Sequence, residues 1–258
     1  MSKILQKVPS SRWLIPINKT RTDVSRSCGG SSIFIKSFWV MSIQTKKTTL
    51  SRLYDVIWYG KKFHKYSSSE IDQTQWCIIS PCDANVIKIG IVDQEWMVIG
   101  KHGRRISITE IYPQKHEKFI WYQYLSLYLS PSKRHFFVMP EDGYLTVESV
   151  RNGKAKIPWI IGLERLRISV LNQLIKKNAS ISCFIKTHKD ILGLIALGSL
   201  NVNWIHIDHN HQRVKKGEKI GHFLLGSGIL LFIPPNYHIN VDIWDDLIIG
   251  QKIAVPDD

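Results

Sequence analysis

The sequence is poor in cysteine and has no long apolar segment, and both shortages narrow what the protein can be. Its 258 residues include four cysteines, none of them in a Cys-x-x-Cys pair: Cys28, Cys77, Cys82 and Cys183. Zinc sites and disulfide frameworks are therefore not predicted, and a reducing compartment is the simplest inference. The longest apolar run near the start, residues 33–41, is interrupted by Lys36 and is too short to cross a bilayer.

Several common signals are also missing. The first residues lack the apolar core and small-residue cleavage site of a secretory signal, so none is expected. Residues 100–105 are only weakly similar to a phosphate-binding turn, because the Gly-Lys-Ser/Thr ending of a P-loop is absent. The Gly-x-Ser-x-Gly turn of serine hydrolases is absent as well.

Positive charge is in excess. The net charge is +14, and much of it lies before residue 66, where acidic residues are sparse. An excess of this size favours an anionic partner, either a membrane surface or nucleic acid. Residues 33–41 combine bulky apolar and aromatic side chains with lysine. They suit either an interfacial helix at a lipid surface or a helix packed on the body of the protein.

The residue pattern before about residue 68 differs from the pattern that follows it. Residues 1–68 look helical and basic, and the serines at 67–69 are typical of a linker. From residue 76 onward, short runs of β-branched and aromatic residues alternate with turn residues, a pattern that predicts short antiparallel strands. One interior helix is predicted over 163–177. We therefore expect an α+β fold, in which a β-rich body of short antiparallel strands with a few helices, 69–258, follows a helical, basic, membrane-associating N-terminal segment, 1–68.

Two polar residues lie at the ends of predicted strands. Asp83 follows Ser80-Pro81-Cys82, and an aspartate in such a turn usually caps backbone N–H groups. His135 lies between a polar turn and an apolar strand. Histidine titrates near neutral pH and suits proton transfer, although a histidine bonded to backbone fits the same position.

Two further segments stand out nearer the C-terminus. One is a local group of polar side chains: His206, Asp208, His209 and His211. Two ligands this close do not make a four-ligand site, so a solvated turn is predicted and no metal is expected. The other is Ser227, which lies between Gly226 and Gly228 at the start of an apolar run. Because glycine permits unusual backbone geometry, this segment is either a bulge or a strained peptide bond that its own serine can attack.

In order along the chain, these segments resemble the motifs of the phosphatidylserine decarboxylase family. Residues 80–86 are similar to the family's Ser-Pro-Ala-Asp-Gly-Lys-Val, and 129–143 to its Leu-Ser-Pro-x-x-Tyr-His-Arg-x-His-x-Pro-x-x-Gly. Residues 216–227 are similar to its Lys-Gly-Glu-x-x-Gly-x-Phe-x-x-Gly-Ser-Thr ending. Shorter elements keep the same order: 103–108, 162–165 and 196–202. The resemblance covers nearly the whole chain.

The resemblance implies a pyruvoyl-dependent enzyme that converts phosphatidylserine to phosphatidylethanolamine in phospholipid biosynthesis. Self-cleavage at Gly226–Ser227 would give a β chain, 1–226, and an α chain, 227–258. Ser227 would become the pyruvoyl group. The pyruvoyl carbonyl would take the amine of the substrate and accept the electrons released as CO₂ leaves.

The site residues of the family map unevenly onto this chain. Asp83 matches the aspartate that takes part in self-cleavage, and His135 matches the first motif histidine, which is linked to decarboxylation. Arg134 stands in place of the tyrosine before it. Val138 stands where the second motif histidine acts in an Asp-His-Ser processing arrangement, and valine cannot accept a proton. Three histidines are candidates to act instead: His102, His135 and His222.

Other functions stay open beside this one. A diverged homologue that does not process itself would act as a lipid-surface binding protein, and a pyruvoyl decarboxylase could act on another amine. Nucleic-acid binding would rest on charge alone and is not expected. The expected partners are a phospholipid substrate and an anionic membrane surface. Peripheral association at the cytoplasmic face is expected because no segment is long enough to span. A homodimer is the assembly that the resemblance suggests.

Overall fold

Short strands make up most of the structure. The computed structural model describes residues 43–44, 71–94, 97–99, 105–110, 112, 116–130, 132–153, 177–199, 204–223 and 227–257. Within these ranges nearly all regular elements are strands, as the runs of β-branched and aromatic residues predict. The β-rich character of the predicted fold is therefore confirmed.

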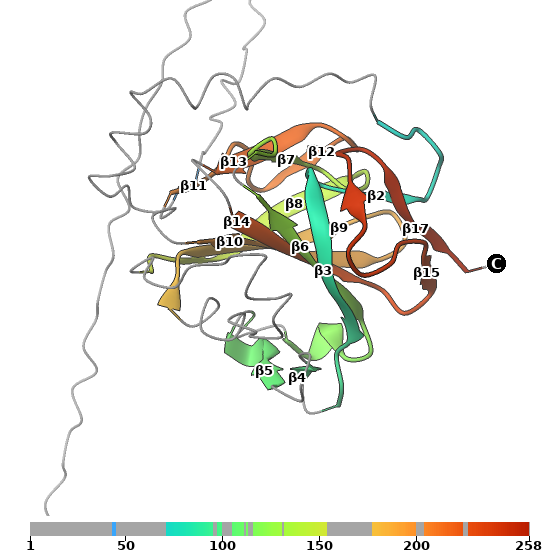
Figure 1. Ribbon diagram of the computed structural model, residues 1–258, viewed down its shortest axis with the longest axis horizontal. Helices are drawn as coiled ribbons and strands as arrows, with labels where there is room; N and C mark the ends of the chain where they lie inside the picture. The colour runs from blue at the N-terminus through green and yellow to red at the C-terminus, as the bar shows by residue number, and fades with distance from the viewer. Residues whose placement is uncertain are drawn as a thin grey trace, which may run out of the picture.

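The largest unit is an eight-stranded antiparallel sheet in the order β12-β8-β9-β10-β14-β6-β3-β16. Its strands are β3 (Ala84–Ile91), β6 (Gln123–Leu129), β8 (Gly143–Arg151), β9 (Ser180–Lys186), β10 (Ile191–Gly198), β12 (Gln212–Val214), β14 (Ser227–Ile233) and β16 (Asp246–Leu247). Strands β10, β14 and β6 cross the centre of the molecule (Figure 1) and have a paired neighbour on both sides.

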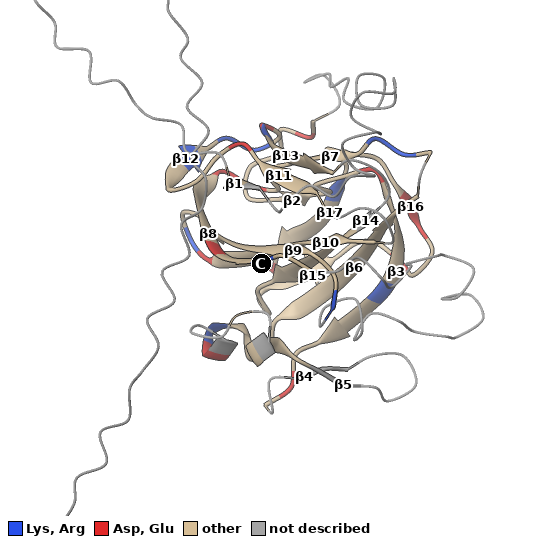
Figure 2. Ribbon diagram, turned by 90° about the vertical axis from the view of Figure 1, so that its left-hand side faces the viewer, with Lys and Arg blue, Asp and Glu red and all other residues tan. Residues whose placement is uncertain are grey.

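Smaller units cover the two faces of this sheet (Figures 1 and 2). On one face lie a four-stranded sheet, β1-β11-β13-β7, and a three-stranded sheet, β15-β17-β2; on the other lie the β4–β5 hairpin and two 3-10 helices. Their bounds are β1 (Ile43–Gln44), β2 (Ile78–Ile79), β4 (Met97–Ile99), β5 (Arg105–Ser107), η3 (Ile108–Glu110), η4 (His116–Phe119), β7 (Phe136–Val138), β11 (Ile205–Ile207), β13 (Lys219–Phe223), β15 (Tyr237–Ile239) and β17 (Lys252–Pro256).

Alternation along the central strands explains these layers. In β14, Ile229, Leu231 and Ile233 pack toward the two smaller sheets, whereas Leu230 and Phe232 pack toward the 3-10 helices. All five side chains are fully buried, and each such burial contributes about 1.5–3 kcal/mol. A strand that is apolar on both faces needs a layer on each side, which is why its sequence is one continuous apolar run.

The helical predictions are tested at only a few positions. In the segment 1–68 the structure describes Ile43 and Gln44, and the helical prediction is wrong there because both residues belong to β1. They pair with β11 along the side of that strand that β13 leaves free, and this tertiary pairing outweighs local propensity. The rest of that segment lies outside the described residues. Of the predicted helix at 163–177 only Lys177 is described, and it is helical.

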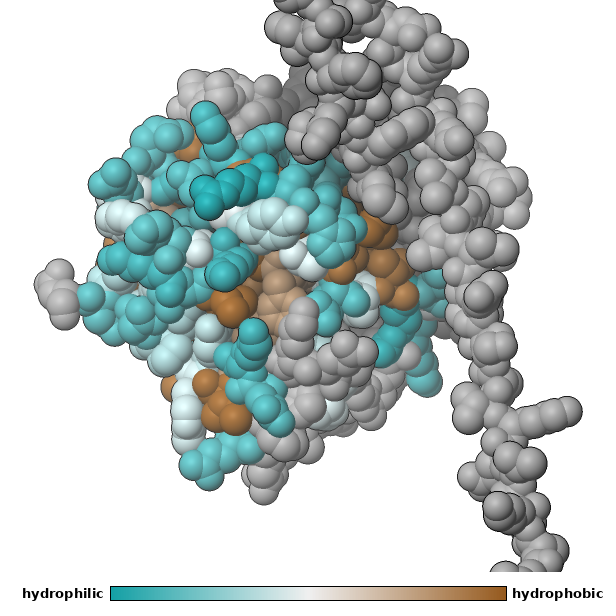
Figure 3. Space-filling model, turned by 180° about the vertical axis from the view of Figure 1, so that it is seen from behind, coloured by the Kyte–Doolittle hydropathy of each residue, from teal (hydrophilic) through white to brown (hydrophobic). Residues whose placement is uncertain are grey.

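One face of the described part is mostly polar. Hydrophilic side chains cover most of the coloured atoms on the face shown in Figure 3, with smaller apolar patches between them. Basic and acidic residues are interspersed along the strands and turns (Figure 2). In this part of the chain, none of the helices combines the length and the apolar character that crossing a bilayer requires.

Candidate active site

Ser227, the predicted cleavage residue, is the first residue of β14. Its backbone pairs with Gly198 at the end of β10 and with Leu129 at the end of β6. Gly226 and the side chain of Ser227 lie outside the described residues. The backbone position suits a new chain end, because from Gly228 onward β14 keeps both of its neighbours without the peptide bond that precedes Ser227.

His135 contacts the strand that leads to this point. The last residue of β13, Phe223, donates its backbone N–H to the carbonyl oxygen of His135 at 2.7 Å. The chain continues from Phe223 to Gly226 and Ser227. His135 itself is 1% exposed. The structure therefore places His135 beside the last residue of β13, which precedes Gly226 by three positions in the sequence.

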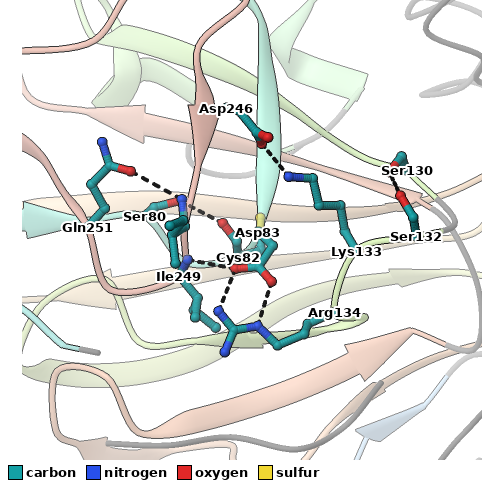
Figure 4. A network of polar contacts seen from close by, with 11 residues as sticks. Ser80, Cys82, Asp83, Ser130, Ser132, Lys133, Arg134, Asp246, Ile249 and Gln251 are labelled. Atoms are coloured by element: carbon teal, nitrogen blue, oxygen red, sulfur yellow. Dashed lines mark hydrogen bonds and ion pairs between the residues drawn. The ribbon is translucent and has the colours of Figure 1, made fainter. Parts of the chain in front are cut away.

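Asp83 accepts hydrogen bonds from Arg134 and from Ile249 (Figure 4). Arg134 donates from Nε to Oδ2 at 2.5 Å and from Nη2 to Oδ1 at 2.8 Å. The backbone N–H of Ile249 donates to Oδ1 at 2.8 Å. A bidentate contact between a guanidinium group and a carboxylate fixes orientation as well as position.

The turn that carries Asp83 is itself anchored. Ser80 donates its hydroxyl to the carbonyl oxygen of Cys82 at 2.8 Å, which closes the turn on itself. Its backbone N–H donates to the carbonyl oxygen of Gln251 at 2.7 Å, and the N–H of Gly250 donates back to the Ser80 carbonyl at 3.0 Å. The turn and the segment that contains Ile249 are thus one hydrogen-bonded unit (Figure 4).

The pKa of Asp83 lies below its ordinary value. Burial raises the pKa, but the hydrogen bonds from Arg134 and Ile249 and the charge of Arg134 together lower it by more. The carboxylate is therefore ionised at neutral pH, and its oxygens already accept hydrogen bonds from the side chain and backbone of Arg134 and from the backbone of Ile249. In this state Asp83 can anchor positive charge and is poorly suited to take a proton.

Val138 occupies β7 beside this network. Its backbone N–H donates to the carbonyl oxygen of Pro81 at 2.8 Å. Its side chain is fully buried in an apolar cluster that includes Ile249, the residue whose N–H binds Asp83. The structure therefore places position 138 next to the Asp83 turn, as a second motif histidine would require, but an apolar side chain fills the position.

Two further histidines face each other across β11 and β13. His206 and His222 are directly opposed, with ring centroids 5.0 Å apart, and Trp204 packs edge-on against His222 at 5.2 Å. His206 Nε2 lies 3.0 Å from Asp208 Oδ1. Burial raises the pKa of Asp208, but the hydrogen bond from His206 and the surrounding positive charge lower it by more. Of the three candidate substitute histidines, His102 lies outside the described residues.

The remaining residues of the local polar group have separate neighbours. His209 Nε2 lies 3.1 Å from the carbonyl oxygen of Lys219. His211 has a left-handed backbone with a φ of 53°, and its carbonyl oxygen accepts the Tyr144 hydroxyl at 2.6 Å. Among the residues that the structure describes, no three His, Cys, Asp or Glu side chains are grouped as metal ligands.

Sequence reasoning misses two contacts of the site, those of Arg134 and Ile249 with Asp83. A signal for the first is present, because a basic residue stands directly before His135 where the family motif has tyrosine. Ile249 acts through its backbone, so the type of its side chain gives no signal.

Comparison with known proteins identifies the family. The sequence model of the phosphatidylserine decarboxylase family matches residues 61–255. The chain belongs to the phosphatidylserine decarboxylase family. The matched range includes Asp83, His135 and Ser227, so all three candidate site residues lie inside the part that is shared with the phosphatidylserine decarboxylase family.

Several bacterial members of the phosphatidylserine decarboxylase family are similar to this chain over much of its length. The phosphatidylserine decarboxylase proenzyme of Anoxybacillus flavithermus is 29% identical over 186 residues, which are 66% of this chain and 68% of the relative. That of a Geobacillus species is 27% identical over 194 residues, 74% and 69% of the two chains. That of Coxiella burnetii is 25% identical over 181 residues, 62% of each. The aligned regions thus span about two thirds of these relatives.

Proposed function

We propose that the protein is a phosphatidylserine decarboxylase made as a proenzyme, which cleaves itself between Gly226 and Ser227. The observation that carries this proposal is the family match over residues 61–255, which contains every candidate site residue. The relatives that share the match are phosphatidylserine decarboxylase proenzymes by name. The placement of Ser227 at the start of β14 supports the cleavage point.

Processing needs only groups that the chain itself supplies, together with water. The Ser227 hydroxyl attacks the carbonyl carbon of Gly226, and the peptide becomes an ester as the nitrogen leaves. Elimination then releases the Gly226 carboxylate and leaves a double bond in the former serine. Hydrolysis at that residue releases ammonia and leaves a pyruvoyl group at the end of the α chain.

The described residues have distinct roles in this scheme. Asp83, ionised and bound by Arg134, holds the turn against the segment that contains His135. The buried imidazole of His135 is the proposed source of the proton that replaces CO₂ on the substrate carbon. The pyruvoyl group supplies the carbonyl that accepts the electrons of the breaking bond. The backbone pairing of Ser227 with Gly198 and Leu129 fits such a group, because it fixes the new chain end between two strands.

A phospholipid substrate also suits the charge of the chain. A net charge of +14 favours an anionic lipid surface, and we extend the proposal to peripheral association with such a membrane at its cytoplasmic face. A homodimer remains the proposed assembly.

A denaturing gel of the purified full chain tests the processing step. Self-cleavage predicts fragments 1–226 and 227–258, the smaller one with a blocked N-terminus, and Ser227→Ala should leave one intact band. CO₂ release from phosphatidylserine vesicles should then exceed release from soluble amino acids. A wild-type chain that stays intact and releases no CO₂ contradicts the proposal, and faster release from amino acids points to another amine substrate.

One observation favours a second candidate function. Val138 fills the place of the second motif histidine, and Arg134 takes the carboxylate that such a histidine would contact. A homologue that does not process itself and instead binds lipid surfaces would have this arrangement. An intact chain that still sediments with anionic vesicles would support this candidate.

A further inference from the structure

A cavity of about 330 Å³ lies at the opposite end of β10 from Ser227. Residues from four loops line it, among them Gln73, Trp76, Glu141, His188, Lys215 and Lys216. His188 belongs to the turn that enters β10, whereas Gly198, the partner of Ser227, ends that strand. Eight residues of extended strand separate the two places by about 25 Å. The cavity is therefore distinct from the position of Ser227.

The floor of the cavity is a buried acid. Glu141 is 4% exposed, and its Oε2 has no hydrogen-bond donor among the described residues. Burying a carboxyl oxygen without a donor is unfavourable, and native structures seldom leave such a group unexplained. Because Glu141 lines the cavity, a cation that enters there is attracted by the charge of its carboxylate.

The wall beside Glu141 is aromatic and preformed. Trp76 has a left-handed backbone with a φ of 62°, which is rare for a bulky residue. Lys216 anchors the loop that carries Trp76. Its Nζ donates to carbonyl oxygens before and after Trp76, those of Thr74 at 2.6 Å and of Cys77 at 3.3 Å. The Trp76 ring already attracts one cation, because Lys189 Nζ lies 4.7 Å from its centroid.

The charges around the cavity are balanced. Glu141 and Asp142 line it together with Lys215 and Lys216. A bare cation would be repelled by the two lysines, and a bare anion would be repelled by the two acids. A neutral molecule with separated charges meets a favourable partner at each end.

We propose that this cavity binds a small zwitterion, with its ammonium group at Glu141 and Trp76 and its anionic group at Lys215 and His188. The volume is at the small end for ligand pockets and suits a molecule of this size. Burial raises the pKa of Glu141 to about 7, against the lowering effect of Lys216, and a bound ammonium would hold the carboxyl ionised. Phospholipid headgroups that carry an amine and free amino acids share this chemistry.

Titration calorimetry on the full-length Ser227→Ala protein tests the proposal independently of any pyruvoyl chemistry. Phosphoethanolamine should bind at least tenfold more tightly than ethanolamine, which lacks the anionic group, or inorganic phosphate, which lacks the ammonium group. Glu141→Gln keeps the shape of the side chain and should weaken binding at least tenfold. Glu117→Gln changes an exposed acid of η4 and should leave the affinity unchanged.

Lys215→Ala gives a second, surface test, because Lys215 is exposed and its loss should not affect folding. It should weaken phosphoethanolamine binding and leave ethanolamine binding as it was. No heat with millimolar phosphoethanolamine, equal affinity for phosphate alone, or unchanged binding in Glu141→Gln would overturn the proposal. Tight binding of a short-chain phosphatidylethanolamine assigns the site to lipid headgroups, whereas binding of alanine without the lipid assigns it to free amino acids.

Discussion

Arg134 donates hydrogen bonds to both carboxylate oxygens of Asp83, from Nε at 2.5 Å and from Nη2 at 2.8 Å. Arg134 directly precedes His135, so this one ion pair joins the Asp83 turn to the segment that carries the proposed proton donor. A side chain that replaces a motif tyrosine thus determines the position of one family site residue relative to another.

Replacing Arg134 with methionine should destabilise the protein. The change leaves a largely buried carboxylate with only the backbone donors of residues 134 and 249, and we expect the free energy of unfolding to fall by about 1–3 kcal/mol, since the pair is partly exposed. Urea unfolding measures the difference. Lys133→Met is the matched control, because Lys133 pairs with the exposed Asp246 and such pairs contribute about 1 kcal/mol or less. Equal effects of the two variants would contradict a special role for Arg134.

Acid should weaken the fold partly through Asp83. Its pKa in the folded protein is lowered, so its contribution to stability is present above the unfolded value near 3.8 and is lost as the pH falls through the folded value. Asp83→Asn lacks this titration. The free energy of unfolding of the wild type should therefore fall more steeply between pH 5 and pH 2 than that of the variant. Parallel pH profiles would show that Asp83 has the same pKa in both states.

The sequence predicts the parts of the site that depend on local pattern. Strands follow from runs such as Ile229 to Ile233, whose alternate side chains are all buried. The turn at Asp83 follows from the Ser-Pro pair, and Ser227, predicted to lie in a strand-like segment, is the first residue of β14. These features need only neighbours in the chain.

Features that depend on distant contacts could not be predicted. Ile43 and Gln44 form a strand because an edge of β11 is available to them, and no local signal shows that edge. The N–H of Ile249 reaches Asp83 across 166 positions of sequence, through a backbone group that every residue type except proline offers. The cavity at Glu141 likewise needs four loops to meet.

His135→Gln should separate decarboxylation from processing. Positioned acid–base groups contribute about 10²–10⁴-fold to rates, so we expect CO₂ release from phosphatidylserine to fall by at least about 100-fold. Glutamine keeps the size and polarity of the buried side chain, and cleavage into two fragments should persist. CO₂ release at the wild-type rate would remove His135 from the reaction. His238→Gln is a suitable control, since His238 is an exposed histidine on β15.

Glu141 should make the fold less stable as the pH rises. Its folded pKa of about 7 exceeds the ordinary 4.5, so its favourable contribution is complete below 4.5 and is lost as the pH rises through 7. Four charged groups act on it besides burial: Lys216, Asp190, Asp142 and Lys189. In Glu141→Gln, the loss of stability between pH 5 and pH 8 should be smaller by about 2 kcal/mol. Thermal or urea unfolding at the two pH values measures it, and an unchanged difference would contradict the raised pKa.

Val138→His should restore a missing proton acceptor to the processing site. Position 138 shares an apolar cluster with Ile249, which binds Asp83, so an imidazole there would lie close to the carboxylate. We expect faster cleavage at Gly226–Ser227, measured as the rate at which the intact band disappears. Burying an imidazole among apolar side chains should also cost about 1–3 kcal/mol of stability.

Arg134 limits this gain, because it already occupies both oxygens of Asp83. Adding Arg134→Tyr to Val138→His frees the carboxylate to orient the new histidine, and the double variant should process fastest of all. Val138→Leu is the control, since it adds similar bulk without a proton acceptor and should cleave at the wild-type rate. If the leucine and histidine variants cleave at equal rates while circular dichroism shows both folded, the missing histidine is not what limits processing, and the base must come from elsewhere in the chain.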